Sequence, residues 1–206
     1  MGQYFRGIIF NEDNTIKKTY CIYSHKTKSK LIEHYKVSNY YIDEYIHQLG
    51  NDYFGCKFAW VGDYADNSYY EESTKYLDKI CANNAEKEGY IPQTPNKFSN
   101  FYIHKELHFL KNYQEFTEKT PIENLSKYRY LINLDKKQYI DLSLFNEGDI
   151  HPLPILCSDG NGKSDSDYDG TNMKYVGKWA YNHIGASNEI PENYNEFKIK
   201  FTSKDK

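Results

Sequence analysis

The chain has 206 residues, of which 39% are hydrophobic and 27% charged, and its formal net charge is −3. This length and composition suit one globular domain, and no apolar run approaches the roughly 20 residues that a membrane-spanning helix needs. The negative charge argues against binding to bare nucleic acid, because proteins that grip phosphates usually carry a basic excess. The N-terminus lacks the pattern of a signal peptide, so we expect a cytoplasmic protein with no membrane partner.

The first part of the chain predicts a hairpin, a helix and a buried strand. Strands are expected at residues 3–10 and 15–24, joined by Asn and Asp residues that are typical of turns. Apolar residues then recur at helical spacing from Leu31 to Leu49, with Ser38 as a second helix cap and Gly50 as the end. The apolar run at 56–62 predicts a buried strand that ends in a polar loop.

Helices are predicted in the middle of the chain, at residues 73–89 and 101–117, and strands return after Pro121. The later strands are expected in a strand–turn–strand unit at 128–145 and then at 152–157, 174–184 and 195–202. This order predicts an α+β fold, with a mostly antiparallel sheet from both chain ends and helices from the middle packed on it. We expect one domain over residues 1–206, in which 68–125 form a helical insertion.

Residues 157–170, CSDGNGKSDSDYDG, combine features of two ligand-binding loops. Gly162, Lys163 and Ser164 match the end of a phosphate-binding P-loop. Cys157 stands where that motif requires glycine, and three carboxylates follow where a helix should begin. These departures argue against a working P-loop.

The same loop also resembles the start of a calcium-binding loop. Asp165, Asp167 and Asp169 alternate before Gly170, as the first ligands of an EF-hand do. Val176 occupies the twelfth position, where an EF-hand requires glutamate. Two interpretations therefore stay open, a weak Ca²⁺ or Mg²⁺ site at these three aspartates or a solvated surface loop, and no other cofactor is expected.

Several longer stretches resemble a set of uncharacterised proteins of bacteria and their phages. MGQYF, KLIEH at 30–34 and WVGDYAD at 60–66 correspond to MGQYY, KLMEH and WVGDYAD in that set. HPLPIL at 151–156, GNGKSDSDYDG at 160–170 and VGKWA at 176–180 correspond to HPLPLL, GNGRGGGDY-x-G and VG-x-WA. The resemblance implies that a glycine-rich loop is the shared feature of 160–170, and it implies an origin in mobile DNA. It carries no known activity.

Two polar segments supply the candidate binding residues. Asp63, Tyr64 and Asp66 follow a predicted buried strand, which is a usual position for site residues. Residues 141–170 contain seven acidic residues against a single lysine, a charge balance that attracts a basic partner. The predicted partner-binding residues are Glu147, Asp149, Asp159, Asn161, Lys163, Asp165, Asp167, Tyr168, Asp169, Asp63, Tyr64 and Asp66.

These features favour a non-enzymatic protein over an enzyme, because the sequence has no nucleophile elbow, metalloprotease helix or defensible Cys–His pair. The preferred hypothesis is a phage or mobile-element protein that binds and inhibits a host defence component, in the manner of an anti-CRISPR protein. Its acidic surface would mimic nucleic acid against a basic host protein or ribonucleoprotein. The alternative is an enzyme or sensor acting on a nucleotide or small phosphate ligand, with the two polar loops at the same end of the molecule across one cleft.

Overall fold

The computed structural model describes residues 5–12, 16–19, 36–62, 121–159 and 173–201. The helices predicted at 73–89 and 101–117 lie outside these residues. So does the insertion predicted at 68–125, apart from its last five positions.

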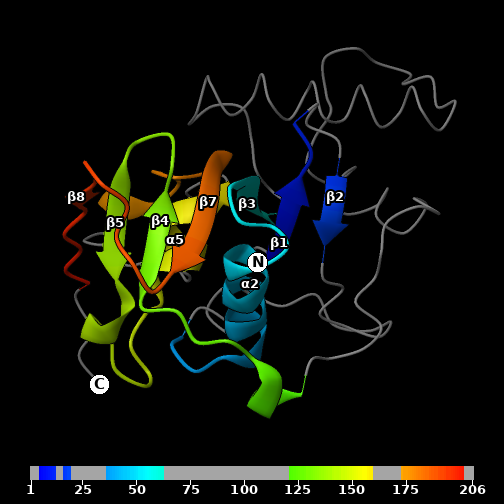
Figure 1. Ribbon diagram of the computed structural model, residues 1–206, viewed down its shortest axis with the longest axis horizontal. Coiled ribbons are helices and arrows are strands. Elements are labelled where there is room, and N and C mark those ends of the chain that lie inside the picture. Colours follow the sequence, from blue (N-terminus) through cyan, green and yellow to red (C-terminus); the bar gives the residue numbers. More distant parts are fainter. Residues whose placement is uncertain (1–4, 13–15, 20–35, 63–120, 160–172, 202–206) are drawn as a thin grey trace, which may run out of the picture.

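One mostly antiparallel sheet organises the described residues (Figure 1). Its strands follow the order β2-β1-β3-β7-β4-β5-β8, and β6 pairs with β3. Strands from both ends of the chain therefore share one sheet, and the fold is a sheet-dominated α+β fold. The bounds are β1 Phe5–Phe10, β2 Ile16–Thr19, β3 Cys56–Gly62, β4 Tyr130–Asn133, β5 Gln138–Asp141, β6 Ser158–Asp159, β7 Asn182–Ser187 and β8 Asn195–Glu196. The described helices are α2 Tyr40–Gly50 and α5 Pro152–Cys157, with 3₁₀ turns η1 Ile122–Asn124, η2 Leu142–Leu144 and η3 Met173–Tyr175.

Both predicted hairpins are confirmed. β1 pairs antiparallel with β2, and β4 pairs antiparallel with β5. In the second hairpin, Lys137 takes a left-handed φ of 50°, and the side chain of Asn133 accepts a hydrogen bond from the Lys136 amide at 3.0 Å. Interactions within the turn, such as this hydrogen bond, set the register of a hairpin independently of distant residues.

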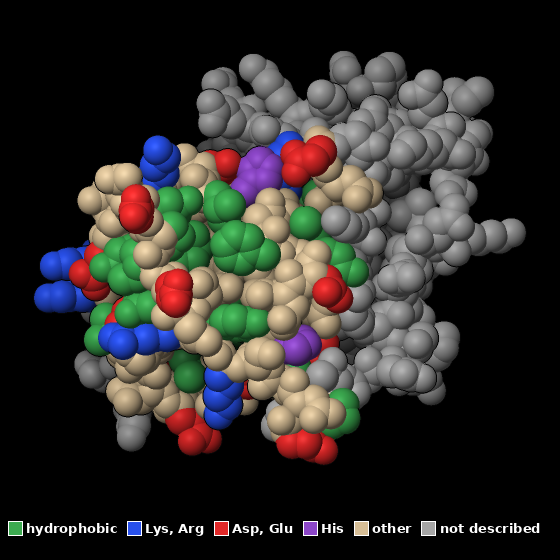
Figure 2. Space-filling view, viewed as in Figure 1, with side chains coloured by type: hydrophobic (Ala, Val, Ile, Leu, Met, Phe, Trp, Pro, Cys, Tyr) green, Lys and Arg blue, Asp and Glu red, His purple; other side chains and the backbone are tan. Residues whose placement is uncertain are grey.

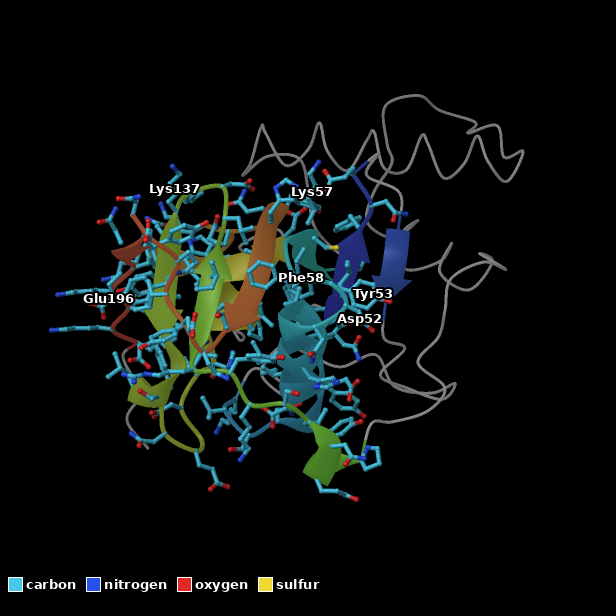
Figure 3. The ribbon with its side chains drawn as sticks, in the orientation of Figure 1. Asp52, Tyr53, Lys57, Phe58, Lys137 and Glu196 are labelled. Atoms are coloured by element: carbon cyan, nitrogen blue, oxygen red, sulfur yellow. The ribbon has the colours of Figure 1, made fainter. Side chains whose placement is uncertain are left out.

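Tyr45 of helix α2 contacts both β1 and β3 of the sheet. The Tyr45 ring lies 5.4 Å from the Phe58 ring and 5.1 Å from the Trp60 ring, both on β3. Its hydroxyl donates a 2.6 Å hydrogen bond to the Gly7 carbonyl on β1. Figure 3 shows Phe58 beside α2. The helix ends at Gly50 as predicted, but its cap is Asn39, which accepts from the Tyr41 amide at 3.0 Å, and not Ser38.

The strand predicted at 152–157 is wrong, because these residues form helix α5. Pro152 and Pro154 both lie in its first turn, where backbone N–H groups have no intrahelical acceptor, so the missing donors cost nothing. His151 caps the helix by accepting the Leu153 amide at 3.1 Å. All six residues of α5 are buried. Their sequence is therefore apolar throughout, without the alternation of apolar and polar residues that indicates a helix.

Only short parts of the last two predicted strands are extended strands in the described residues. Within 174–184 only the end is extended, since β7 begins at Asn182 after a left-handed Tyr181 with φ of 61°. The preceding amides bind α5 instead of a strand: Gly177 donates to the Ile155 carbonyl at 3.0 Å, and Trp179 donates to the Leu156 carbonyl at 2.7 Å. Within 195–202 the strand covers only Asn195–Glu196, which pairs parallel with β5.

The core lies between the sheet and the two helices, and Trp60 and Trp179 are both fully buried in it. Within the described segments, no helix combines the length and the apolar character that crossing a bilayer requires.

Candidate functional site

The carboxyl ends of β3 and β6 lie side by side, and the segments with the two predicted polar loops begin after them. β6 pairs parallel with β3, with Trp60 opposite Ser158 and Val61 opposite Asp159. Because parallel strands end at the same edge, the chain leaves Gly62 and Asp159 from neighbouring positions. The segments that begin there carry the candidates Asp63, Tyr64, Asp66, Asn161, Lys163, Asp165, Asp167, Tyr168 and Asp169, which all lie outside the described residues.

Asp159 is buried, so the expectation that it lies in an exposed loop is wrong. Its exposed fraction is 2%, and its carboxylate accepts a 2.6 Å hydrogen bond from the Tyr181 hydroxyl. Burial disfavours the charged form and raises the pKa of Asp159 to about 6, while the Tyr181 hydrogen bond opposes that rise. The reason for the error is that the parallel pairing extends to Asp159, which keeps its side chain inside the sheet edge.

Tyr181 is a site residue that sequence reasoning missed. Its φ of 61° is uncommon for a bulky side chain, and its amide donates to the Phe58 carbonyl at 2.8 Å. The ring lies 5.6 Å from the Phe10 ring. Tyr181 thus contacts β1, β3 and β6, close to the carboxyl ends of β3 and β6. Nothing in the sequence around it signals this position.

Fewer acidic side chains of the segment 141–170 are available for partner binding than its composition indicates. Glu147 and Asp149 are exposed, and the Asp149 carboxylate accepts from the Asn146 amide at 2.8 Å. Asp141 is paired with Arg129 at 2.8 Å, and this partner lowers the pKa of Asp141 to about 2. Two of the seven acidic residues, Asp141 and Asp159, are therefore not free surface charges. Figure 2 shows acidic side chains scattered over the described part of one face, without a concentrated patch.

A second group of titratable side chains, also missed from the sequence, surrounds His183 on β7. Its Nδ1 lies 2.7 Å from the Asp135 carboxylate, and its Nε2 lies 3.4 Å from the Glu12 carboxylate. The His183 amide also donates to Asp135 at 2.9 Å, so the β4–β5 turn is tied to β7. Lys57 on β3 pairs opposite His183. Figure 3 shows Lys57 at the same end of the sheet as Lys137, which lies in the β4–β5 turn. These contacts indicate a structural role, in which His183 holds the β4–β5 turn against β7.

Metal ligands of the usual kinds do not cluster in the part of the chain that is described. There, no group of three or more His, Cys, Asp or Glu side chains has the arrangement that holds a metal ion. The aspartates proposed from the sequence, Asp165, Asp167 and Asp169, lie outside this part. The described chemistry is therefore one buried carboxyl with a tyrosine partner, next to the origins of two polar loops. Comparisons with protein-family models, curated proteins and solved structures found no match to this chain.

Proposed function

We propose that this chain is a non-enzymatic binding protein whose working surface is formed by the loops at 63–66 and 160–170. The observation that carries the proposal is the parallel pairing of β3 with β6, from which both loops start as neighbours. Two polar loops that begin side by side on a rigid sheet make a composite surface, a common basis for recognition. The sequence resemblance to phage and bacterial proteins supports a role in mobile DNA. The concrete form is inhibition of a host defence component, as by an anti-CRISPR protein.

The partner that fits this surface is a host protein or ribonucleoprotein with a basic face. Five acidic residues of the segment remain as candidates for contact after Asp141 and Asp159 are set aside: Glu147, Asp149, Asp165, Asp167 and Asp169. They would mimic nucleic-acid phosphates, while bare nucleic acid is not an expected ligand at a net charge of −3. The proposal includes one domain over residues 1–206 that acts in the host cytoplasm. In that domain, helices from the insertion at 68–125 pack on the sheet.

Reversing the charges of Asp165, Asp167 and Asp169 to lysine is expected to abolish capture of the partner, with at least a tenfold loss in a quantitative pull-down from host lysate. The melting temperature should stay within about 2 °C of wild type, because exposed loop charges contribute little to stability. The measurement compares captured proteins by mass spectrometry at equal bait.

The matched control reverses Asp52, Glu189 and Glu192, three acidic residues that are exposed on the described surface. This variant carries the same change in net charge and should retain the partner. If both triple variants lose it equally, the effect is one of overall charge. If neither loses it, the acidic loop is not the binding surface.

Divalent-metal binding at the same three aspartates is proposed to be weak. Adjacent carboxylates repel one another unless a cation is present, but the missing twelfth-position carboxylate leaves part of the coordination shell to water. Calorimetry with Ca²⁺ and with Mg²⁺ is expected to give a Kd no tighter than about 10 µM. The variant with asparagine at all three positions should bind neither ion. Submicromolar affinity in wild type would instead make the loop a dedicated cation site.

One observation favours the second candidate function, an enzyme or sensor for a nucleotide or small phosphate ligand. Asp159 is a buried carboxyl with a pKa raised to about 6, and it lies where parallel strands end, a frequent position for ligand sites. The two candidates differ in what they bind. The first requires a captured protein, and the second a small molecule bound between the loops.

A further inference from the structure

A second site, separate from the β3–β6 loops, lies where α2 begins. A cavity of about 430 Å³ opens between the first turns of α2, the segment 125–128 and the start of α5. Its volume falls within the range of small-molecule sites. None of the described residues that line it belongs to β3 or β6. The cavity is therefore separate from the loop surface proposed above.

The walls of the cavity are fixed by hydrogen bonds between segments that are distant in sequence. The Val37 amide donates to the Asp149 carbonyl at 2.9 Å, which joins the chain before α2 to the chain before α5. The Ser126 amide donates to His47 Nδ1 at 2.9 Å, which fastens the segment 125–128 to α2. The cavity is thus formed by the fold itself.

His151 supplies the buried polar group of the cavity. His151 is one of the residues that line the cavity, and it is only 5% exposed. Nδ1 accepts the Leu153 amide, and burial lowers the pKa of His151 to about 3, so the ring is neutral and its proton sits on Nε2. In the described part of the chain, this Nε2–H has no hydrogen-bond acceptor. A buried donor without an acceptor is costly, and a ligand oxygen or nitrogen in the cavity would remove that cost.

Asp43 and Lys127 place an acceptor and a cation in the same cavity. Asp43 lies half-buried in the first part of α2, and burial raises its pKa while nearby Lys127 lowers it. Lys127 is exposed and lies at the solvent side. A ligand would therefore meet a neutral donor, a carboxylate and one ammonium group.

Two tyrosines make the cavity suit a flat ligand. The Tyr40 hydroxyl donates to Glu44 at 3.1 Å, and the Tyr128 hydroxyl donates to Asn51 at 3.0 Å. With their hydroxyls engaged elsewhere, both residues contribute mainly ring surface to the cavity. Aromatic surface of this kind favours planar heterocycles over aliphatic ligands.

We propose that this cavity binds a nucleotide, with a ring acceptor of the base on His151 Nε2–H, a base N–H donor on Asp43 and the phosphate at Lys127. A neutral imidazole suits an uncharged ring acceptor, whereas a carboxylate placed there would be desolvated without a counter-charge. A base offers a donor and an acceptor on the edge of one flat ring, and that pattern matches the walls of the cavity. Lys127 is the one lysine among the described residues that line the cavity, and it suits one phosphate.

The test is calorimetric titration of the full chain with AMP, GMP, CMP and UMP, their nucleosides, inorganic phosphate and free glycine. At least one nucleotide is expected to bind with a Kd on the order of 10 µM, and its nucleoside more weakly. His151→Ser keeps a capping oxygen for α5 but removes the donor, and should weaken the nucleotide about tenfold. Lys127→Gln should weaken the nucleotide about fivefold and leave the nucleoside unchanged. Lys178→Gln, at an exposed lysine outside the cavity lining, is the matched control and should change neither.

A loss of preference among the four bases in the Asp43→Asn variant supports the proposal. If His151→Ser does not fold, the two single variants Asp43→Asn and Lys127→Gln still test it. Absence of nucleotide and nucleoside binding to folded wild type at 5 mM ligand, about 500 times the expected Kd, overturns it. Equal affinity for inorganic phosphate or glycine also overturns it, as does binding that none of the three cavity variants changes.

Discussion

Replacing Asp159 with asparagine is expected to raise the free energy of unfolding by about 3 kcal/mol at pH 8 and to change it little at pH 4. The pKa of Asp159 is raised from 3.8 to about 6 by burial. Between these values the folded chain holds a proton that the unfolded chain releases, so stability falls as the pH rises from about 4 to about 6. Above that window the buried carboxylate destabilises the fold. The asparagine variant avoids this cost and still accepts the Tyr181 hydroxyl.

Urea unfolding of both proteins at unit steps from pH 4 to pH 8 measures this difference. Comparing the two at each pH matters because burial holds the pKa of His151 at about 3. Its titration in the unfolded chain makes both proteins less stable as the pH falls below about 6.5, and it cancels in the difference. A pH-independent difference, or a loss of stability at pH 8, would mean that the Asp159 carboxylate is stabilised in the fold.

Asp141→Asn is the matched control, and its effect on the free energy of unfolding at pH 8 should have the opposite sign. Arg129 holds the pKa of Asp141 at about 2, below its usual value. The ion pair therefore contributes above about pH 4, and its contribution disappears as the pH falls toward 2. This variant should lose stability at pH 8, though modestly, because the Arg129 side chain is 57% exposed and its charge is screened by water.

A stabilising effect of Asp159→Asn would also bear on function. A buried carboxyl that costs stability is retained in many proteins because a site needs it. If the variant is more stable but loses the captured partner or ligand, Asp159 acts on what the neighbouring loops bind. If it keeps both, the carboxyl only anchors the start of the loop through Tyr181.

The sequence predicts those parts of the fold that depend on neighbours in the chain. Both hairpins followed from turn residues within four positions, and the end of α2 followed from Gly50. The segment 152–157 was misassigned because an apolar run buried on all sides carries no period. Its two prolines held the information, since a spacing of two fits the first turn of a helix better than an interior strand.

The candidate site was only partly predictable. The polar loops after β3 and β6 stand out in composition, but their common origin depends on a parallel contact between two residues of each strand. Tyr181 and His183 act through partners that are 22 and 48 residues away. The cavity at α2 combines three segments, and the first two, at Tyr40 and Lys127, are more than 80 residues apart in the chain. No local sequence pattern encodes these long-range contacts, because tertiary packing alone creates them.

Replacing Gly7 with alanine is expected to reduce the free energy of unfolding by about 1–3 kcal/mol. A Cβ at this position would lie 2.5 Å from Cζ of the Tyr45 ring. The Tyr45 ring is fully buried and packs against Phe58 and Trp60, so these neighbours oppose a shift of the ring. Gly7 lies in an ordinary extended conformation of β1, so backbone strain does not contribute and the cost is steric. Urea unfolding at pH 7 gives the value.

A double-mutant cycle with two replacements of Tyr45 identifies the source of this cost. Tyr45→Phe keeps the ring and removes only the hydroxyl that donates to Gly7, so Gly7→Ala should remain costly in that background. Tyr45→Leu removes the ring, and Gly7→Ala should then be nearly neutral, a coupling of at least about 1 kcal/mol. Equal costs in all three backgrounds would show that Tyr45 does not lie over Gly7. Since α2 also forms one wall of the cavity at its first turns, a shift of the helix off β1 would remove the proposed nucleotide site as well.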